Sequence, residues 1–138
     1  MSAVLVDSNV LIDIATLDPV WASWSAEQVE TIARHHRLVI NPVIYAEATV
    51  SFGSIDEADS RLPLDMVGRE PIPFEAAFLA GKAFAAYRRR GGERTSLLPD
   101  FLIGAHAAVR GHRILTRDDR RYRAFFPSVR LIVPRRRS

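Results

Sequence analysis

The sequence predicts an α/β protein, a three-layer α/β/α sandwich around a mainly parallel sheet. Three observations indicate this class. Short apolar runs of strand length recur along the chain, as at 3–6 and 38–40. Longer stretches with helical spacing of apolar residues separate them, and such alternation is typical of a parallel sheet covered by helices on both faces. An aspartate, Asp7, ends the first run, at the sheet edge where open α/β proteins place their ligands.

The first two helices are predicted from cap and break signals. After the strand at 3–6, Ser8 or Asn9 can cap a helix that ends before the break at Asp18-Pro19. A second, amphipathic helix is expected at 21–36, because its apolar and polar residues separate onto two sides. The apolar run at 38–40 then reads as a second buried strand.

Two further helices begin with recognisable residues. Asn41-Pro42 opens a helix, because proline suits a first-turn position. Ser54 followed three residues later by Glu57 resembles a capping box, which indicates a helix from Ser54 to Leu64. The stretch at 68–73 is rich in proline and is interpreted as a connection.

The second half repeats the alternation. An alanine-rich helix is expected at 74–90 because Gly91-Gly92 closes it, and the apolar helix from Asp100 ends at Gly111. The remaining elements follow from apolar runs and from the break at Pro127. They are a loop at 91–98, a helix at 100–110, a strand at 113–116, a turn or short helix at 118–126 and a strand at 129–133.

Length and composition point to one folded domain. A chain of 138 residues that is 48% hydrophobic can bury a core, so we assign residues 1–138 to a single domain with a basic tail at 134–138. The absence of cysteine excludes disulfides and thiolate metal sites, and it fits a reducing cytoplasm. No leader is visible, and no apolar run approaches the roughly 20 residues of a membrane span. We therefore expect a cytoplasmic protein without a membrane partner.

Charge is divided unevenly along the chain. Residues 1–68 hold three Arg against ten acids, a balance of −7, whereas residues 69–138 hold fifteen Arg and one Lys against six acids, a balance of +10. Arginine suits bidentate contacts to phosphate. Two interpretations stay open: the second half contacts a nucleic-acid backbone, or its arginines form solvated faces that reflect coding bias.

Four acids stand out by their positions. Asp7 and Asp118 each follow a predicted strand. Asp100 begins an apolar helix, and Glu47 is the single acid within another. Each has a structural explanation, because a first-turn acid favours the helix dipole and an aspartate can cap a helix. Four acids at one sheet edge are harder to explain in that way, because burying an unpaired carboxylate is costly.

An oxygen-rich cluster without imidazole has a defined chemistry. Mg²⁺ and Mn²⁺ prefer such ligands. These ions can lower the pKa of a bound water and stabilise the departing oxygen of a phosphodiester. The four acids therefore indicate a hydrolytic metal site, provided that the fold brings them together.

Four segments and a C-terminal ending carry a pattern that covers the whole chain. They are Val6-Asp7-Ser8-Asn9-Val10-Leu11-Ile12-Asp13, Asn41-Pro42-Val43-Ile44-Tyr45-Ala46-Glu47, Leu98-Pro99-Asp100-Phe101-Leu102-Ile103-Gly104-Ala105-His106-Ala107 and Ile114-Leu115-Thr116-Arg117-Asp118, followed by Arg121-Tyr122-Arg123, Phe126-Pro127 and Leu131-Ile132. In this order the segments resemble the PIN-domain family, and within it the VapC-type toxin ribonucleases.

The resemblance implies an α/β/α sandwich, Mg²⁺- or Mn²⁺-dependent hydrolysis of RNA by a metal-activated water, a homodimer and a cognate small antitoxin. It maps the family's acids onto this chain as catalytic residues, three of them also metal ligands. The catalytic set is Asp7, Glu47, Asp100 and Asp118, and the metal set is Asp7, Asp100 and Asp118. Ser8, Asn9 and Thr116 match the family's supporting polar residues beside the metal, and the neighbouring Asp119 could assist Asp118 or substitute for it. The arginines that could contact RNA are Arg88, Arg89, Arg90 and Arg117.

The other notable side chains receive structural interpretations. The run Arg88–Arg90 could hold RNA or the antitoxin, or could be only a solvated helix end. Asp13 is interpreted as a solvent-facing acid near the site. The remaining assignments are His35 and His36 as helix C-terminal caps, His106 as a packed or interface residue, His112 as a turn residue, and Trp21 and Trp24 as core or dimer contacts.

Two alternatives to the ribonuclease remain. The first is a catalytically silent PIN-like module that binds RNA or a protein partner. The second is a phosphatase of the haloacid dehalogenase type, which also begins with an aspartate after a strand but usually needs a second aspartate two residues later, where this chain has Asn9. Neither of the usual nucleotide-binding glycine motifs is present.

Overall fold

Five short strands form one parallel sheet in the computed structural model, which describes residues 2–91 and 98–135. The order of the strands is β3-β2-β1-β4-β5, and every neighbouring pair is parallel. The strands are β1 (Val4–Val6), β2 (Leu38–Ile40), β3 (Val67–Arg69), β4 (Arg113–Leu115) and β5 (Leu131–Ile132). The predicted α/β class with a parallel sheet is confirmed.

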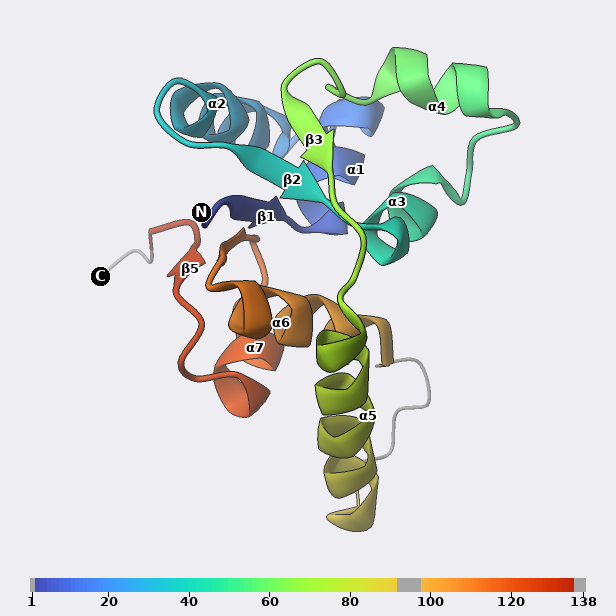
Figure 1. The fold of residues 1–138 in the computed structure, drawn as a ribbon. Helices are drawn as coiled ribbons and strands as arrows, with labels where there is room; N and C mark the ends of the chain where they lie inside the picture. The colour runs from blue at the N-terminus through green and yellow to red at the C-terminus, as the bar shows by residue number, and fades with distance from the viewer. Residues whose placement is uncertain (1, 92–97, 136–138) are drawn as a thin grey trace.

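Helices cover both faces of this sheet (Figure 1). Helices α1 to α4 lie on one side, and α5 to α7 lie on the other, with α5 extending away from the sheet beside α6. Their bounds are α1 (Ser8–Thr16), α2 (Ala22–Ala33), α3 (Pro42–Thr49), α4 (Ile55–Arg61), α5 (Phe74–Arg89), α6 (Leu98–Arg110) and α7 (Arg120–Phe125). Among the described residues, none of these helices has the length and hydropathy that crossing a membrane requires.

The centre of the sheet forms the core. Every residue of β1 and β2 is buried, as are Ile114 and Leu115 of β4. A strand that is buried on both faces must be apolar throughout, which explains the continuous apolar runs at these positions. Burying one such aliphatic side chain contributes about 1.5–3 kcal/mol. The sheet therefore fixes the position of the carboxyl edge to which polar residues are attached.

Caps begin the helices where the sequence indicates them. The Oδ1 of Asn41 accepts from the backbone N–H of Ile44 at 2.9 Å, with Pro42 in the first turn of α3. The Oγ of Ser54 accepts from the N–H of Glu57 at 3.1 Å and so caps α4. The first helix differs from expectation, because Asp7 rather than Ser8 or Asn9 occupies the cap position of α1.

One strand was not predicted. The stretch at 68–73, interpreted as a connection, begins with the last two residues of the edge strand β3. Gly68 has low strand propensity. Gly68 and Arg69 are exposed on β3, which has a neighbouring strand on one side only. Residues 92–97 of the expected loop and 136–138 of the expected basic tail lie outside the described residues.

Helices α6 and α7 approach each other closely at Gly104. A methyl group at this position would overlap the ring of Phe126, which follows α7 and is buried. Glycine is therefore needed here because the ring occupies the space of a side chain. The close approach holds α7, and the side chains it carries, against the first turns of α6.

Candidate active site

Asp7 is the anchor of the polar edge of the sheet. It follows β1 and is only 4% exposed. Its Oδ1 accepts from the N–H of Ser8 at 2.8 Å, and its Oδ2 accepts from the hydroxyls of Thr116 and Tyr122, each at 2.9 Å. These three donors hold the carboxylate in one orientation. Burial nevertheless raises its pKa above the usual range, because the hydrogen bonds only partly offset the loss of hydration.

Glu47 reaches the same edge from α3. Its Oε1 accepts from the hydroxyl of Ser8 at 3.0 Å. Burial raises the pKa of Glu47, and the nearby charges of Asp7 and Asp100 raise it further, against the opposing effect of the Ser8 hydrogen bond. The lone acid of this helix is therefore directed towards Asp7.

Asp100 and Asp118 share one cation. The Nη1 of Arg121 donates to Oδ2 of Asp100 at 2.7 Å, and its Nη2 donates to Oδ2 of Asp118 at 3.2 Å. Burial raises the pKa of Asp100, and the charges of Asp7 and Asp118 add to this effect even though Arg121 opposes it. Partial burial works against the charge on Arg121, but the two acids raise its pKa overall.

The four predicted acids therefore converge, although they come from distant parts of the sequence. Asp7 and Asp118 follow central strands, while Glu47 and Asp100 come from α3 and α6 on opposite faces of the sheet. Burial is the largest cause of the raised pKa of Glu47 and of Asp100, and the charges of neighbouring acids add to it. The guanidinium of Arg121 bridges two of these four acids. An all-oxygen donor set of this kind fits Mg²⁺ or Mn²⁺, and the guanidinium between two carboxylates shows that the position accepts a cation.

Polar neighbours join the acids into one network. Thr116, fully buried at the end of β4, receives a hydrogen bond from Nδ2 of Asn9 at 3.1 Å and from the N–H of Asp118 at 3.1 Å. The same hydroxyl donates to Asp7. Asp119, the other predicted supporting acid, pairs instead with Arg123, whose Nε lies 2.7 Å from its Oδ2.

Asp13 is buried, so its interpretation as a solvent-facing acid is wrong. It is 1% exposed and receives both Nε and Nη2 of Arg117, at 2.7 and 2.9 Å. The hydroxyl of Ser25 donates to it as well. Arg117 also lies over the ring of Trp21. The charge of Asp13 is thus neutralised inside the fold, one helical turn beyond Asn9 on α1.

Sequence reasoning missed two residues of the site, Arg121 and Tyr122. Both lie on α7, three and four residues after Asp118. Side chains at those spacings share a helix face with the residue that precedes them. The positional signal was present, but nothing in the sequence states that a tyrosine is buried against Asp7. Burial raises the pKa of Tyr122 well above its usual value, and the charges of Asp7 and Asp100 raise it further.

An open groove runs beside these residues. It has a volume of about 490 Å³ and is lined by Tyr87 of α5 and by residues of α7 and the turn before it. The lining residues are Tyr87, Asp118, Arg120, Arg121, Ala124 and Phe125. Arg121 therefore contacts the acids on one side and borders the groove on the other.

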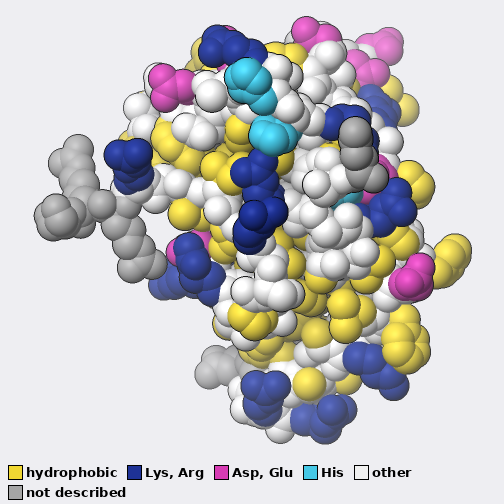
Figure 2. All heavy atoms as spheres, turned by 60° about the vertical axis from the view of Figure 1, so that its left-hand side comes forward, with side chains coloured by type: hydrophobic (Ala, Val, Ile, Leu, Met, Phe, Trp, Pro, Cys, Tyr) yellow, Lys and Arg dark blue, Asp and Glu magenta, His cyan; other side chains and the backbone are white. Residues whose placement is uncertain are grey.

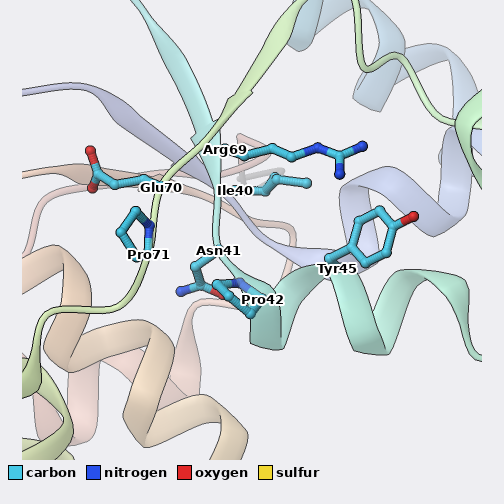
Figure 3. Close-up of a pocket in the computed structure, with 7 residues that line it drawn as sticks. All are labelled: Ile40, Asn41, Pro42, Tyr45, Arg69, Glu70 and Pro71. Atoms are coloured by element: carbon cyan, nitrogen blue, oxygen red, sulfur yellow. The ribbon is translucent and has the colours of Figure 1, made fainter.

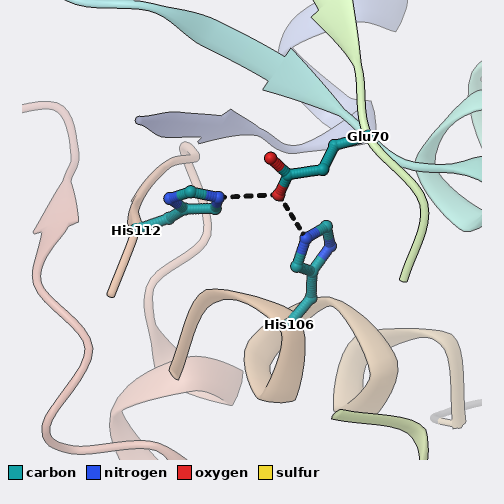
Figure 4. Close-up of side chains that lie close together, drawn as sticks. All are labelled: Glu70, His106 and His112. Atoms are coloured by element: carbon teal, nitrogen blue, oxygen red, sulfur yellow. Dashed lines mark hydrogen bonds and ion pairs between the residues drawn. The ribbon is translucent and has the colours of Figure 1, made fainter. Parts of the chain in front are cut away.

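A second buried cluster contains Glu70, His106 and His112 (Figure 4). One ligand atom of each lies within 4.8 Å of the others, a spacing that a metal ion could use. The Nε2 atoms of His106 and His112 lie 2.7 and 2.8 Å from the same Oε1 of Glu70. Burial alone would raise the pKa of Glu70, but the two imidazoles together lower it.

The hydrogen bonds on the far side of each ring favour a proton network over a metal. The N–H of Ala3 donates to Nδ1 of His112 at 2.9 Å. The amide nitrogen of Asn41 lies 3.0 Å from Nδ1 of His106, while the amide oxygen of Asn41 is occupied by Ile44. Both Nδ1 atoms therefore accept, so both Nε2 atoms carry protons and donate to Glu70. A metal-bound imidazole needs the reverse arrangement.

This cluster confirms that His106 is packed, as expected. It also connects the start of α3 to α6 through Asn41, and these helices carry Glu47 and Asp100. A pocket of about 370 Å³ lies beside it at the carboxyl ends of β2 and β3 (Figure 3). Its lining is formed by Ile40, Asn41, Pro42, Tyr45, Arg69, Glu70 and Pro71.

The basic surface is dispersed. Figure 2 shows basic side chains spread over one face, with hydrophobic side chains between them and basic ones gathered at its lowest part, where α5 ends. Arg88 and Arg89 end α5 and are exposed, as is Arg90.

The acidic site is a cluster of carboxylates at the carboxyl edge of an all-parallel sheet, held by hydroxyl and amide donors.

These features define the class, an α/β protein with an acidic active-site edge. The profile described as "PIN domain" matches residues 4–126. The chain belongs to the PIN-domain family. A comparison with curated proteins finds no match.

Solved structures with the same fold include VapBC and FitAcB structures and one described as a toxin–antitoxin complex from Klebsiella pneumoniae. One is VapBC2 from Rickettsia felis, solved with a DNA fragment from the VapBC2 promoter. It superposes with a TM-score of 0.74 at 15% identity, over 96% of this chain and 98% of that chain. VapBC-1 from nontypeable Haemophilus influenzae has a TM-score of 0.69 at 19% identity, over 94% and 96%. FitAcB from Neisseria gonorrhoeae has a TM-score of 0.65 at 17% identity, over 93% and 95%. At these identities the likeness establishes the fold.

Proposed function

We propose that this chain is a metal-dependent endoribonuclease that acts as the toxin of a toxin–antitoxin pair. The observation that carries the proposal is the convergence of Asp7, Glu47, Asp100 and Asp118 on one edge of the sheet. PIN domains are nucleases, and a set of acids that exceeds its internal counter-charge fits the binding of Mg²⁺ or Mn²⁺.

The residues have separate roles in this proposal. Asp7, Asp100 and Asp118 would hold the ion, and Glu47 would accept a proton from the attacking water. Such an ion, when bound, lowers the pKa of a water and neutralises charge that develops on a phosphodiester. Thr116 and Tyr122 orient Asp7 by donating to its Oδ2.

Cleavage of RNA tests this proposal directly. Purified protein should cut RNA in Mg²⁺ or Mn²⁺ and stop in EDTA, and Asp7→Asn should abolish cutting. Glu30→Gln is the matched control, because Glu30 is an exposed acid on α2. Cleavage that persists in EDTA would contradict the metal mechanism. Metal binding without cleavage of any RNA would instead favour the silent PIN-like module.

A small antitoxin and a second copy of this chain are the proposed partners. The solved relatives are toxin–antitoxin complexes. Phe74 and Phe78 lie one turn apart on α5 and are 94% and 69% exposed, so an apolar strip is available for an interface. Expression of the chain alone in the cytoplasm of a host cell should arrest growth of that cell. Expression of Asp7→Asn should leave growth unchanged. Equal toxicity of both forms would argue against a catalytic toxin.

A further inference from the structure

Arg121 occupies a position between the acidic site and the adjoining groove. Its guanidinium bridges Asp100 and Asp118, at 2.7 and 3.2 Å. Its side chain is 42% exposed, in contrast to the 13% of Asp100. Arg121 therefore pairs with two acids of the site while part of its side chain remains exposed to solvent. A purely structural ion pair does not require this exposure.

The bridge has the form of a counter-ion. A guanidinium can donate to two carboxylates at once because its N–H groups form a rigid fork. Like charges at short range disfavour joint ionisation, and Asp7, Asp100 and Asp118 are close enough to influence one another. Among the described residues, Arg121 is the cationic side chain that hydrogen-bonds to two of these acids, Asp100 and Asp118. Its removal would leave the cluster without this internal neutralisation.

Arg121 occupies the same two carboxylates that would hold a divalent cation. Oδ2 of Asp100 and Oδ2 of Asp118 both receive Arg121. A divalent cation held by Asp100 and Asp118 would compete with the guanidinium for their negative charge, although an ionised carboxylate offers about four lone-pair sites. Binding of one must therefore weaken binding of the other.

The groove offers the displaced side chain a second place. Arg121 lines it together with Arg120 and Tyr87. Arg120 is 87% exposed, with its backbone N–H donating to Asp118. Two neighbouring arginines beside an aromatic ring suit a single-stranded RNA, because arginine contacts phosphate and bases stack on tyrosine.

We propose that Arg121 is a two-position residue: it holds the metal-free acids together as their counter-ion, and on metal binding it moves into the α5–α7 groove to contact the phosphate backbone of the substrate. This inference rests on the proposed ribonuclease function. It assigns Arg121 to substrate positioning and makes metal loading and RNA contact parts of one event.

Metal affinity without RNA is the decisive measurement. Mn²⁺ should bind Arg121→Gln about tenfold more tightly than the parent, because the variant has no bridge to displace. Arg121→Lys should lie between the two, because an ammonium cannot span both carboxylates with the same fork. Arg123→Gln is the matched control, since Arg123 is on the same helix but pairs with Asp119. Titration calorimetry with Mn²⁺ gives all four affinities.

RNA binding supplies the second readout. In Mn²⁺, Arg121→Gln should raise KM for a short RNA more than it lowers kcat, and the salt dependence of RNA binding should decrease by about one contact. In EDTA its melting temperature should fall below that of the parent, and Mn²⁺ should close the gap.

The outcomes separate this inference from the function on which it rests. If the parent binds Mn²⁺ and loses it in Asp7→Asn, but Arg121→Gln binds Mn²⁺ no more tightly than the parent, the two-position proposal is overturned and the ribonuclease proposal stands. If the parent binds no Mn²⁺ and cuts no RNA, both are overturned. Tighter Mn²⁺ binding together with weaker RNA binding supports both steps.

Discussion

The hydroxyl of Tyr122 donates to Oδ2 of Asp7 at 2.9 Å, a contact between residues 115 positions apart that joins the last helix to the first strand. Tyr122→Phe deletes this donor without changing the ring. The pKa of Asp7 should rise further, because the hydrogen bond stabilises the carboxylate. The acid limb of the pH–rate profile should therefore move to higher pH, with a loss of stability of about 1 kcal/mol. Tyr45→Phe is the control, because its hydroxyl donates to Asp59 rather than to a site acid, and an unmoved limb would contradict this role.

Asp100→Asn should be inactive yet at least as stable as the parent in EDTA at pH 7. Because the pKa of Asp100 is raised, the folded chain binds more protons than the unfolded chain, so stability falls as pH rises through that window. The amide removes this penalty and still accepts from Arg121, a gain of about 1 kcal/mol. Mn²⁺ should reverse the ranking, because the parent binds it better. Melts in EDTA and Mn²⁺ check this, and an equal loss in both would contradict the shared pocket.

Arg117→Ala should destabilise the fold by about 2–3 kcal/mol, because among the described residues it leaves Ser25 as the remaining side-chain donor to the buried carboxylate of Asp13. Arg123→Ala removes an exposed pair with Asp119 and should change stability by at most about 0.5 kcal/mol. Urea denaturation of both variants measures the difference. If the two losses are similar, the Asp13 pair contributes no more than a surface contact.

Acid should weaken the fold through His106. Burial lowers its pKa below 6.5 despite the favourable Glu70, while His112 and Arg110 oppose its charge as well. The folded chain then binds fewer protons than the unfolded chain, so stability is complete above pH 6.5 and declines as pH falls towards the lowered pKa. His106→Gln should flatten this decline, and the exposed His35→Gln should not. Chemical denaturation at several pH values measures how the stability of each variant depends on pH. Equal slopes for the two variants would contradict this role of His106.

The sequence predicted most of the fold because its strongest signals are local. The buried strand at 38–40 and the caps at Asn41 and Ser54 depend on residues adjacent in the chain, and the structure has them as expected. The edge strand β3 was missed because it gains stability from pairing with β2 rather than from its own residues.

The site divides in the same way. The positions of Asp7 and Asp118 after strands, and of Asp100 in a first turn, are local facts, and the parallel sheet brings them together. Their roles remain a prediction. The burial of Asp13 depends on Arg117, which is 104 positions away, so the residues next to Asp13 in the sequence could not indicate that its charge would be paired inside the fold. Tyr122 and Arg121 likewise depend on how α7 packs against α6.

The order of the strands has a consequence for the time at which the acidic cluster is completed during synthesis. β1 pairs with β2 on one side and with β4 on the other, so half of the sheet can assemble long before residue 113 is made. Asp7 and Glu47 are made with this part of the sheet, and Asp100 follows on α6 before β4. Thr116, Asp118 and Tyr122, which complete and orient the cluster, emerge only with β4 and α7. A growing chain therefore stays incomplete at its acidic edge until nearly the whole domain has been translated.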